Sequence, residues 1–292
     1  MNEDSKYIFQ ELETLSDKIK KTPGLPEELE ERVVQMLDRL NRMAKLGHYA
    51  AEFDTLARYI EVIVSIPWEN RTTDKLSLVD TKKILDKNHF GMEDVKERIL
   101  EYMSTMILIK QRGGNAIAKS PVLLFVGLQG IGKTTLAISI AEALGREFVR
   151  ISMGALGSSL ELRGQSKVYP EAEPGQIIKA LIKTKVRNPV ILLDEIEKAS
   201  GEKGLRSDIM AILLEILDPN QNPTFRDHYI DFPVDLSETL FICSANNTGT
   251  ISTALMDRME VIKMPSYTDA EKIAIGRDYL LPKVIETAVL TP

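Results

Sequence analysis

The 292-residue chain has one cysteine, one tryptophan, three histidines and no long hydrophobic run. The lone Cys243 excludes an intramolecular disulfide framework and fits a reducing compartment. Apolar runs such as 122–126 and 190–193 are far shorter than the roughly 20 residues that a membrane helix needs. The acidic first residues are not followed by an apolar segment, so we expect no signal peptide. These features predict a cytoplasmic protein without a membrane partner.

Charge and histidine content exclude further classes of protein. The chain has 37 Lys and Arg against 43 Asp and Glu, a net charge of −6, and 27% of its residues are charged. This balance is ordinary for a soluble globular chain and disfavours one built mainly to neutralise DNA phosphates. The histidines are scattered without the spacing of metal ligands. We therefore interpret them as structural residues and Cys243 as a small buried apolar residue.

Residues 1–68 have the apolar periodicity of helices. Three sets of apolar residues recur at helical spacing and predict three helices. These sets are Ile8, Leu12, Leu15 and Ile19; Leu29, Val33, Leu37 and Leu40; and Phe53, Leu56, Ile60 and Ile63. The turn residues 22–26 separate the first two helices, and Pro67 follows the third. A small helical bundle or coiled-coil arm and a dedicated partner-binding surface both fit this pattern.

After a polar linker at residues 69–80 the pattern changes to short apolar runs that alternate with helical stretches. Runs that are apolar on both faces and separated by helices predict a parallel sheet covered on both sides. The runs are Val122–Val126, Phe148–Ile151, Val190–Leu193, Leu240–Cys243 and Val261–Ile262. We therefore expect an α/β domain over residues 81–267, with ligands at the carboxyl ends of its strands. Residues 268–292 begin a further helical segment, whose first helix is expected over Thr268–Leu281.

The strongest local motif is G-x-x-x-x-G-K-T, which follows the first strand and precedes a helix expected over Thr134–Leu144. Glycines let backbone N–H groups cradle a phosphate at the positive end of the helix dipole. Lys133 can reach the β- and γ-phosphates of ATP, and the Thr134 hydroxyl can ligate Mg²⁺. The bland alternative is a glycine-rich turn. The predicted nucleotide-binding residues here are Gly127, Leu128, Gln129, Gly130, Ile131, Gly132, Lys133, Thr134 and Thr135.

Two carboxylates, Asp194 and Glu195, follow the apolar run 190–193. At the end of a strand, Asp194 can hold the Mg²⁺ shell while Glu195 orients or deprotonates the attacking water. An acidic strand-to-loop boundary is the bland alternative. The phosphate loop some 60 residues upstream favours the catalytic interpretation.

Two further residues are ambiguous on spacing alone. Asn246 directly follows the strand expected at 240–245 and can contact the γ-phosphate or hold the attacking water, or it can simply cap a turn. Arg258 can stabilise transition-state charge in the site of a neighbouring subunit, or it can form a surface ion pair. Spacing does not separate these alternatives.

From about Leu25 to Pro282 the chain closely resembles the ATPase part of the Lon family of ATP-dependent proteases, a branch of the AAA+ ring ATPases. The resemblance is carried by Ser65-Ile66-Pro67-Trp68, Asn88-His89-Phe90-Gly91, Arg150-Ile151-Ser152, Leu213-Leu214-Glu215-Ile216-Leu217-Asp218-Pro219, Phe225-Arg226-Asp227-His228-Tyr229 and Asp257-Arg258-Met259-Glu260-Val261-Ile262. It implies a P-loop AAA+ fold in a homo-hexameric ring with ATP at each subunit boundary. Asn246 matches the sensor-1 position and Arg258 the arginine finger. Phe90 and Gly91 match the segment that lies against adenine.

The resemblance also implies an aromatic pore loop that threads polypeptide through the ring. The family pattern R-G-H-R-R-T-Y-[IV]-G-A-x-P-G aligns with residues 163–175, where Tyr169 is kept. The aliphatic partner is Pro170, the next glycine is Glu171, and the basic pair is Ser166-Lys167. Proline stiffens the loop and removes a backbone donor, and Glu171 and Glu173 make it acidic. These departures bear on how the loop grips a substrate.

By this resemblance the chain is an ATP-hydrolysing motor module that unfolds and translocates unfolded or misfolded proteins. Residues 268–292 correspond to the start of the family's helical lid. The serines and lysines of this sequence do not have the spacing of a Ser/Lys proteolytic pair. We therefore expect peptide cleavage from a peptidase domain or chain in trans. The alternative is a nucleotide-gated scaffold, similar to a chaperone, without productive turnover. A weaker alternative is a DNA-linked AAA+ factor, although nucleic acid is not the expected partner.

Overall fold

The computed structural model describes residues 3–45, 51–113, 120–169, 171–199 and 205–287. The chain packs as two compact units, and each is assembled from separate stretches of sequence. The helical unit comprises Met1–Arg71, Gly157–Arg187 and Pro223–Leu236. The sheet unit comprises Thr72–Leu156, Asn188–Asn222 and Ser237–Pro292. The domain boundaries given above follow the order of the sequence and stay a prediction.

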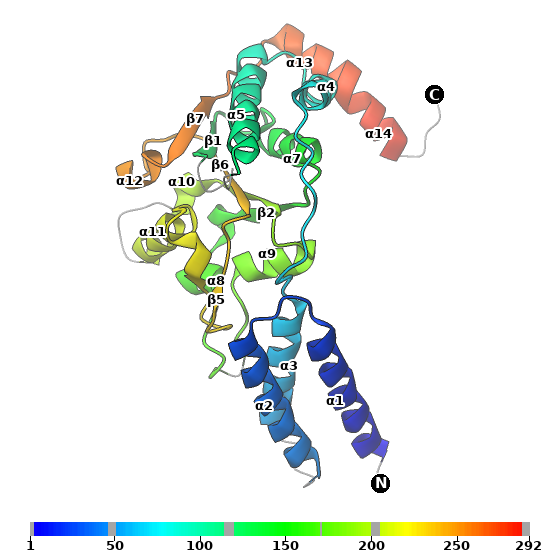
Figure 1. Ribbon diagram of the computed structural model, residues 1–292. Coiled ribbons are helices and arrows are strands. Elements are labelled where there is room, and N and C mark those ends of the chain that lie inside the picture. Colours follow the sequence, from blue (N-terminus) through cyan, green and yellow to red (C-terminus); the bar gives the residue numbers. More distant parts are fainter. Residues whose placement is uncertain (1–2, 46–50, 114–119, 170, 200–204, 288–292) are drawn as a thin grey trace. The chain divides into compact units, whose positions relative to one another are not determined.

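Three amphipathic helices form the first part of the helical unit: α1 (Glu3–Lys21), α2 (Glu27–Lys45) and α3 (Ala51–Ser65). They pack on one another (Figure 1). Their buried residues include Leu12, Leu15 and Ile19 of α1, Leu29, Val33, Leu37 and Leu40 of α2, and Phe53, Ile60 and Ile63 of α3. The expected helices are therefore present, with the predicted apolar residues inside, except that Ile8 and Leu56 are only half-buried.

The rest of the helical unit comes from two later stretches. The first contributes α8 (Ser159–Arg163), which begins with a Ser158–Glu161 capping box, and α9 (Gln176–Thr184). The second contributes β4 (Phe225–Arg226) and β5 (Pro233–Val234), which pair antiparallel. Strands of two residues leave too short a pattern to be predicted from sequence. Tyr59 of α3 donates a hydrogen bond to Ile230 O at 2.8 Å, so the segment between β4 and β5 contacts the N-terminal helices.

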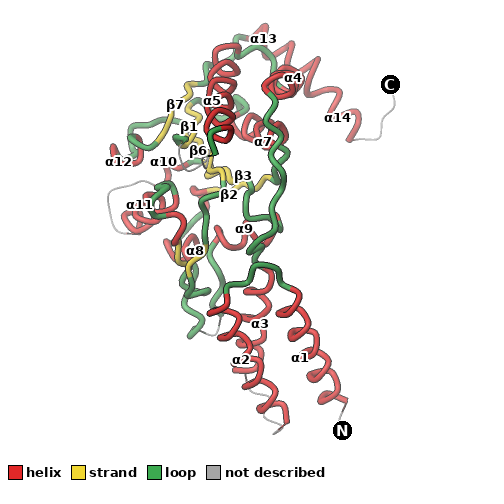
Figure 2. The backbone as a smooth tube through the Cα atoms, viewed as in Figure 1, coloured by secondary structure: helices red, strands yellow, loops and turns green. Residues whose placement is uncertain are grey.

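The sheet unit contains a five-stranded sheet, whose strands are yellow in Figure 2. The strand order is β2-β3-β6-β1-β7, and every neighbouring pair is parallel. The strands are β1 (Val122–Val126), β2 (Phe148–Ser152), β3 (Val190–Asp194), β6 (Leu240–Ala245) and β7 (Met259–Lys263). The predicted parallel α/β fold is confirmed. β7 is longer than its apolar run because residues 259–263 pair with all five residues of β1.

Helices cover both faces of this sheet. On one face α4 (Leu78–Asn88), α5 (Glu93–Gln111) and α7 (Lys133–Leu144) pack on alternate residues of the strands. These strand residues are Leu123, Phe125, Val190, Leu192, Leu240, Ile242 and Ile262. The intervening residues, such as Leu124, Ile191 and Cys243, are also buried. Cys243 is therefore the small buried residue that the sequence predicted, and burial raises the pKa of its thiol.

Of the other helices described, all but α11 are short or lie near the end of the chain. They are η1 (Met153–Ala155), α10 (Ile196–Ala199), α11 (Leu205–Ile216), η2 (Asn222–Thr224) and α12 (Thr253–Met256). The helix expected over Thr268–Leu281 is instead α13 (Asp269–Ile275), the π-helical turn η3 (Gly276–Leu280) and α14 (Leu281–Thr287). Pro282 lacks an N–H, and its ring crowds the carbonyl four residues earlier, which explains the wider turn. Residues 288–292 of that segment lie outside the described residues. No helix in the described ranges is both long and apolar enough to cross a membrane.

Candidate nucleotide site at the carboxyl ends of the strands

The loop between β1 and α7 has a backbone that requires glycine. Gly130 and Gly132 have φ of +82° and +100°, a region that other residues rarely adopt. A Cβ on Gly127 would lie 2.8 Å from Met264 O, so a side chain does not fit there. Thr135 Oγ1 donates to Gly132 O at 2.8 Å and closes the first turn of the helix. The loop therefore has the fixed shape that a phosphate cradle needs.

Lys133, the first residue of α7, is buried within this loop. Its Nζ donates to Gly127 O at 2.6 Å, to Leu128 O at 3.0 Å and to Asn246 Oδ1 at 2.9 Å. Burial lowers the pKa of this ammonium group, while the carboxylates of Asp194, Glu197 and Glu195 act in the opposite direction. The structure thus brings Lys133 and Asn246 together, and Asn246 follows β6 as the sequence predicted.

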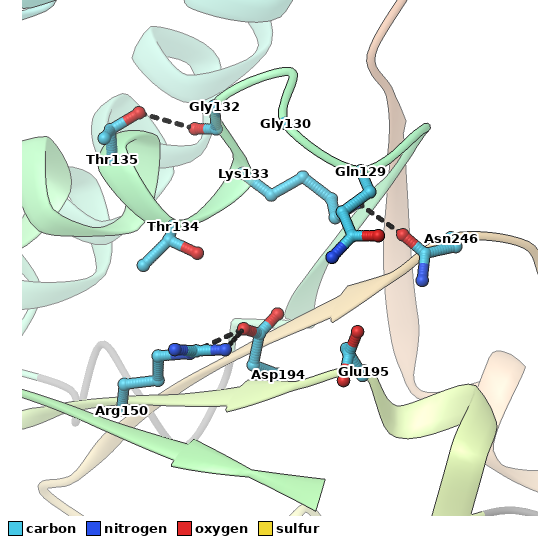
Figure 3. A pocket seen from close by; sticks show the side chains of 10 residues that line it. All are labelled: Gln129, Gly130, Gly132, Lys133, Thr134, Thr135, Arg150, Asp194, Glu195 and Asn246. Atoms are coloured by element: carbon cyan, nitrogen blue, oxygen red, sulfur yellow. Dashed lines mark hydrogen bonds and ion pairs between the residues drawn. The ribbon is translucent and has the colours of Figure 1, made fainter. Parts of the chain in front are cut away.

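Asp194, the last residue of β3, faces α7. It lies on the same face as Val190 and Leu192 because side chains alternate along a strand. Ser244 Oγ donates to its Oδ1, and Arg150 Nε and Nη2 both lie 2.6 Å from its Oδ2 (Figure 3). The carboxylate is buried, whereas half of the Arg150 side chain is exposed. Ser244 and Arg150 therefore fix both oxygens of Asp194.

Glu195 leaves the strand with φ of +61°, one of four non-glycine residues with positive φ in the described chain. Such backbones cost energy and are common at functional sites. Its N–H donates to Ser244 Oγ at 3.3 Å, and its Oε2 accepts from Lys198 Nζ at 2.8 Å. The strained turn points Glu195 into the cavity that Asp194 also lines.

Glu197 orients the amide of Asn246. Its Oε1 accepts from Asn246 Nδ2 at 2.7 Å and from the Asn246 N–H at 3.2 Å. Because the amide NH₂ is bound to Glu197, Asn246 Oδ1 is the atom directed at Lys133. The other oxygen of Glu197, Oε2, is buried and accepts no hydrogen bond from any described residue. The Glu197 carboxylate thus serves mainly to bind the side-chain NH₂ and the backbone N–H of Asn246.

Two cavities meet at this loop. The first has a volume of about 330 Å³ and a polar lining. Its lining residues are Gln129, Gly130, Gly132, Lys133, Thr134, Thr135, Arg150, Asp194, Glu195 and Asn246. The second, of about 390 Å³, shares Gly130, Gly132 and Thr135 and is lined by Phe90, Ile131, Tyr267 and Tyr279, among others. A polar chamber joined to an aromatic one suits a phosphate chain joined to a planar base.

Some predicted residues lie at the margin of these cavities. Gly127 and Leu128 do not line them but offer their carbonyls to Lys133. Gly91 has φ of +60° and turns the chain directly after Phe90. Phe90 packs edge-to-face on Tyr279, with ring centroids 6.3 Å apart. Phe90 and Tyr279 therefore form one part of the aromatic wall of the second cavity, and Tyr267 also lines it. The sequence alone did not single out Tyr279 or Tyr267.

Arg258 lies apart from both cavities, between α12 and β7. Its Nη2 lies 2.9 Å from Asp218 Oδ2, and its Nη1 donates to Ala254 O at 3.1 Å. Within this chain Arg258 is therefore held by an acid of its own unit, as the ion-pair alternative expects, and the role in a neighbouring site stays a prediction.

Tyr169 belongs to the helical unit, in the loop between α8 and α9. Val168 and Tyr169 are 83% and 65% exposed, and Glu171 is exposed as well. Glu173 Oε2 accepts from Lys179 Nζ at 2.5 Å. Pro170 lies outside the described residues. Tyr169 is therefore exposed in this chain, and its role in a pore loop stays a prediction.

Sequence reasoning did not assign Arg150, Ser244 and Glu197 to the site. Arg150 is the only charged residue of the run 148–152, which was a usable signal. Ser244 and Glu197 carry no such signal, because their roles depend on partners about 50 residues away in sequence.

Comparisons with known proteins agree with this geometry. The family described as "ATPase family associated with various cellular activities (AAA)" matches residues 123–266. Lon protease 1 of Bacillus subtilis is 45% identical over 276 residues, which cover 94% of this chain and 34% of that protein. Lon protease 1 of Myxococcus xanthus is 44% identical over 87% of this chain and 30% of its own length. Lon protease 2 of Thermus thermophilus is 44% identical over 87% of this chain and 32% of its own length. The chain spans about a third of the length of these curated relatives.

Proposed function

We propose that this chain, which belongs to the Lon family and carries its AAA ATPase domain, binds ATP with Mg²⁺ at the strand ends and hydrolyses it. The observation that carries the proposal is the meeting of three elements at one polar cavity. These are the glycine loop with Lys133, the acids Asp194 and Glu195, and Asn246 held by Glu197. The adjoining aromatic cavity supports a nucleotide base as the other half of the ligand.

The residues of the polar cavity divide the work of phosphoryl transfer. Lys133 and the backbone N–H groups of the loop bind the phosphates. Thr134 and Asp194 supply the oxygen ligands that Mg²⁺ prefers, and they are the residues that would hold it. A bound Mg²⁺ neutralises charge on the β- and γ-phosphates. Glu195 takes a proton from the attacking water, and Asn246 directs its amide oxygen toward Lys133 at the same end of the cavity.

Asp194 changes partners in this proposal. Arg150 holds the Asp194 carboxylate in the structure, and Mg²⁺ needs the same carboxylate. Arg150, half exposed at the cavity, then turns to the phosphates, for which a planar guanidinium is well suited. Binding of nucleotide and metal therefore breaks the ion pair between Arg150 and Asp194.

For the assembled protein we propose a ring in which Arg258 reaches the nucleotide of a neighbouring copy. In that ring Tyr169 contacts unfolded protein substrates, and a peptidase domain or chain receives them. The match to Lon proteases along 94% of this chain supports this role, and the exposure of Tyr169 is compatible with it. The same reasoning assigns residues 1–68 to a helical N-terminal region, 81–267 to the large ATPase domain and 268–292 to the start of the lid.

Glu195→Gln tests the catalytic half of this function. The variant keeps the shape of the side chain but removes the base, so ATP still binds while phosphate release stops. Equilibrium binding of a fluorescent ATP analogue and steady-state phosphate release measure the two effects. Turnover near that of the unchanged chain would exclude Glu195 as the base. Specific activity that rises with protein concentration would support shared sites, whereas flat background release would favour a nucleotide-gated scaffold.

A further inference from the structure

The exposed loop that carries Tyr169 runs from Gly164 to Gly175, and these two glycines are its root. A buried carboxylate contacts the root. Asp227 is fully buried, and its Oδ2 accepts from the Gly175 N–H at 2.8 Å. At the other end of the root, a Cβ on Gly164 would lie 2.8 Å from the same oxygen. Gln165 N–H donates to Glu173 O at 3.1 Å and closes the loop between the two glycines. One carboxylate thus lies against both ends of the loop.

Asp227 is itself fixed by the segment that follows it. Its Oδ1 accepts from the N–H groups of Tyr229 at 2.7 Å and Ile230 at 3.3 Å. The His228 N–H donates to Arg163 O at 2.9 Å, directly before the loop begins. The segment 227–230 therefore binds backbone groups on both sides of the loop, through the Asp227 carboxylate and the His228 N–H. These bonds depend little on which side chains the loop itself carries.

Lys167, two residues before Tyr169 in the loop, contacts a tyrosine of the N-terminal helices. Lys167 Nζ lies 4.0 Å from the centroid of the Tyr59 ring, within the range of a cation–π contact. The Tyr59 ring packs on that of Tyr229 with centroids 5.6 Å apart, and its hydroxyl donates to Ile230 O. Tyr59 is 1% exposed, so this ring is a rigid platform. Burial is the main cause that lowers the pKa of Lys167, with the nearby Arg32 acting in the same direction.

The contact with Tyr59 determines what the loop presents to solvent. Lys167 is the only cation between residues 165 and 173, and it is turned back onto the helices. Two turns, Tyr169 N–H to Ser166 O and Ala172 N–H to Tyr169 O, then leave Val168 and Tyr169 exposed. Ala172, by contrast, is buried. The tip is therefore apolar with Glu171 beside it, and it carries no free ammonium group.

We propose that Tyr59 and Lys167, together with Asp227, are positioning residues that hold Tyr169 outward for contact with an extended polypeptide. This inference rests on the proposed role of Tyr169 in substrate binding. It adds that the N-terminal helices set the geometry of that loop through α3, because Tyr59 belongs to those helices. The contacts involved all lie within the helical unit.

The direct test is hydrogen exchange of the loop in the 292-residue chain carrying Lys167→Met, with Lys167→Arg as the matched control. Methionine keeps the length of the side chain but loses its charge, whereas arginine keeps the cation–π contact. We expect the amides of Tyr169 and Ala172 to exchange roughly tenfold faster in Lys167→Met and at the original rate in Lys167→Arg. Tyr59→Leu is a second variant for the same measurement, with Tyr59→Phe as its control. Unchanged exchange in Lys167→Met overturns the proposal.

The functional test is the Kd for a fluorescein-labelled, reduced and carboxymethylated α-lactalbumin, measured by anisotropy with Mg²⁺ and a slowly hydrolysed ATP analogue. Lys167→Met should weaken binding by about threefold or more, whereas Lys167→Arg should bind as the unchanged chain does. Basal ATP hydrolysis should be unchanged in both variants. Tyr169→Ala serves as the reference. If Tyr169→Ala weakens binding but Lys167→Met does not, the positioning role is wrong. If Tyr169→Ala also binds normally, the failure lies in the proposed substrate role, and the inference falls with it.

Discussion

Arg150 of β2 lies against Asp194 of β3, with its Nε and Nη2 both 2.6 Å from Asp194 Oδ2. The two residues are 44 positions apart in sequence and meet because their strands are neighbours in the sheet. This pair holds the carboxylate that the proposed function assigns to Mg²⁺. Binding of the metal and the breaking of the ion pair are therefore coupled.

The first prediction follows from this pair. Arg150→Gln removes the guanidinium that competes for Asp194, so the Mg²⁺ concentration needed for half-maximal nucleotide binding should fall. Because Arg150 is half exposed, solvent screens the pair, and we expect a change of about threefold. Titration of Mg²⁺ at saturating nucleotide measures it, because the phosphate contact that Arg150→Gln also loses then has little effect. Arg150→Lys should behave more like the unchanged chain. A higher Mg²⁺ requirement in Arg150→Gln would contradict the competition.

The second prediction concerns Glu197, which binds both N–H donors of Asn246. Glu197→Ala frees the Asn246 amide to rotate, so kcat for ATP hydrolysis should fall by roughly tenfold while KM changes by less than about twofold. Asn246→Ala should have a similar effect. The double variant should be no worse than either single one, because both remove the same interaction. Additive losses in this cycle would show that Glu197 acts independently of Asn246.

The third prediction is a pH dependence of stability from Asp227. Burial raises the pKa of Asp227 to about 6 from an ordinary value of 3.8, against the opposing effect of three backbone N–H donors. Because the folded chain binds this proton more tightly, Asp227 stabilises the fold most at low pH. That contribution is lost as pH rises from about 4 to about 6 and amounts to about 3 kcal/mol as an order of magnitude.

Asp227→Asn tests this dependence by removing the titrating group. The difference in unfolding free energy between the two chains should change across pH 4 to 6.5 and be constant above it, as measured by urea denaturation with circular dichroism. Asp231→Asn makes the same change of charge at a carboxylate that is 60% exposed and is the control. Parallel pH profiles for the unchanged chain and Asp227→Asn would exclude the raised pKa.

The fourth prediction compares two glycines of the sheet unit. A Cβ on Gly127 would meet the Met264 carbonyl, so Gly127→Ala should destabilise the chain by about 1–3 kcal/mol and weaken nucleotide binding. Gly276 is helical and has open space around it, so Gly276→Ala should be neutral or stabilise by about 0.5–1 kcal/mol. Thermal unfolding of the two variants side by side measures the contrast. A stable Gly127→Ala chain would show that the loop can move away from Met264.

Much of the sheet unit was predictable because its signals are local. The apolar runs of β1 and β3 coincide with the predicted strands, apart from one residue at the end of β3. The glycine loop and the two acids were identified from their neighbours in sequence, and the structure brings both to one cavity. The order of the strands was not predicted, because it depends on pairings between residues that are far apart in sequence.

The sequence by itself determined the phosphate loop, the pair Asp194 and Glu195, and the amphipathic helices, because glycine, carboxylate and apolar spacing act over a few residues. Only the tertiary structure decided that Arg150 holds Asp194, that Glu197 orients Asn246, and that Tyr59 and Asp227 fasten the loop of Tyr169. These contacts join residues 44 to 108 positions apart. Such pairs form only when the chain has packed, and neither partner marks the other in the sequence.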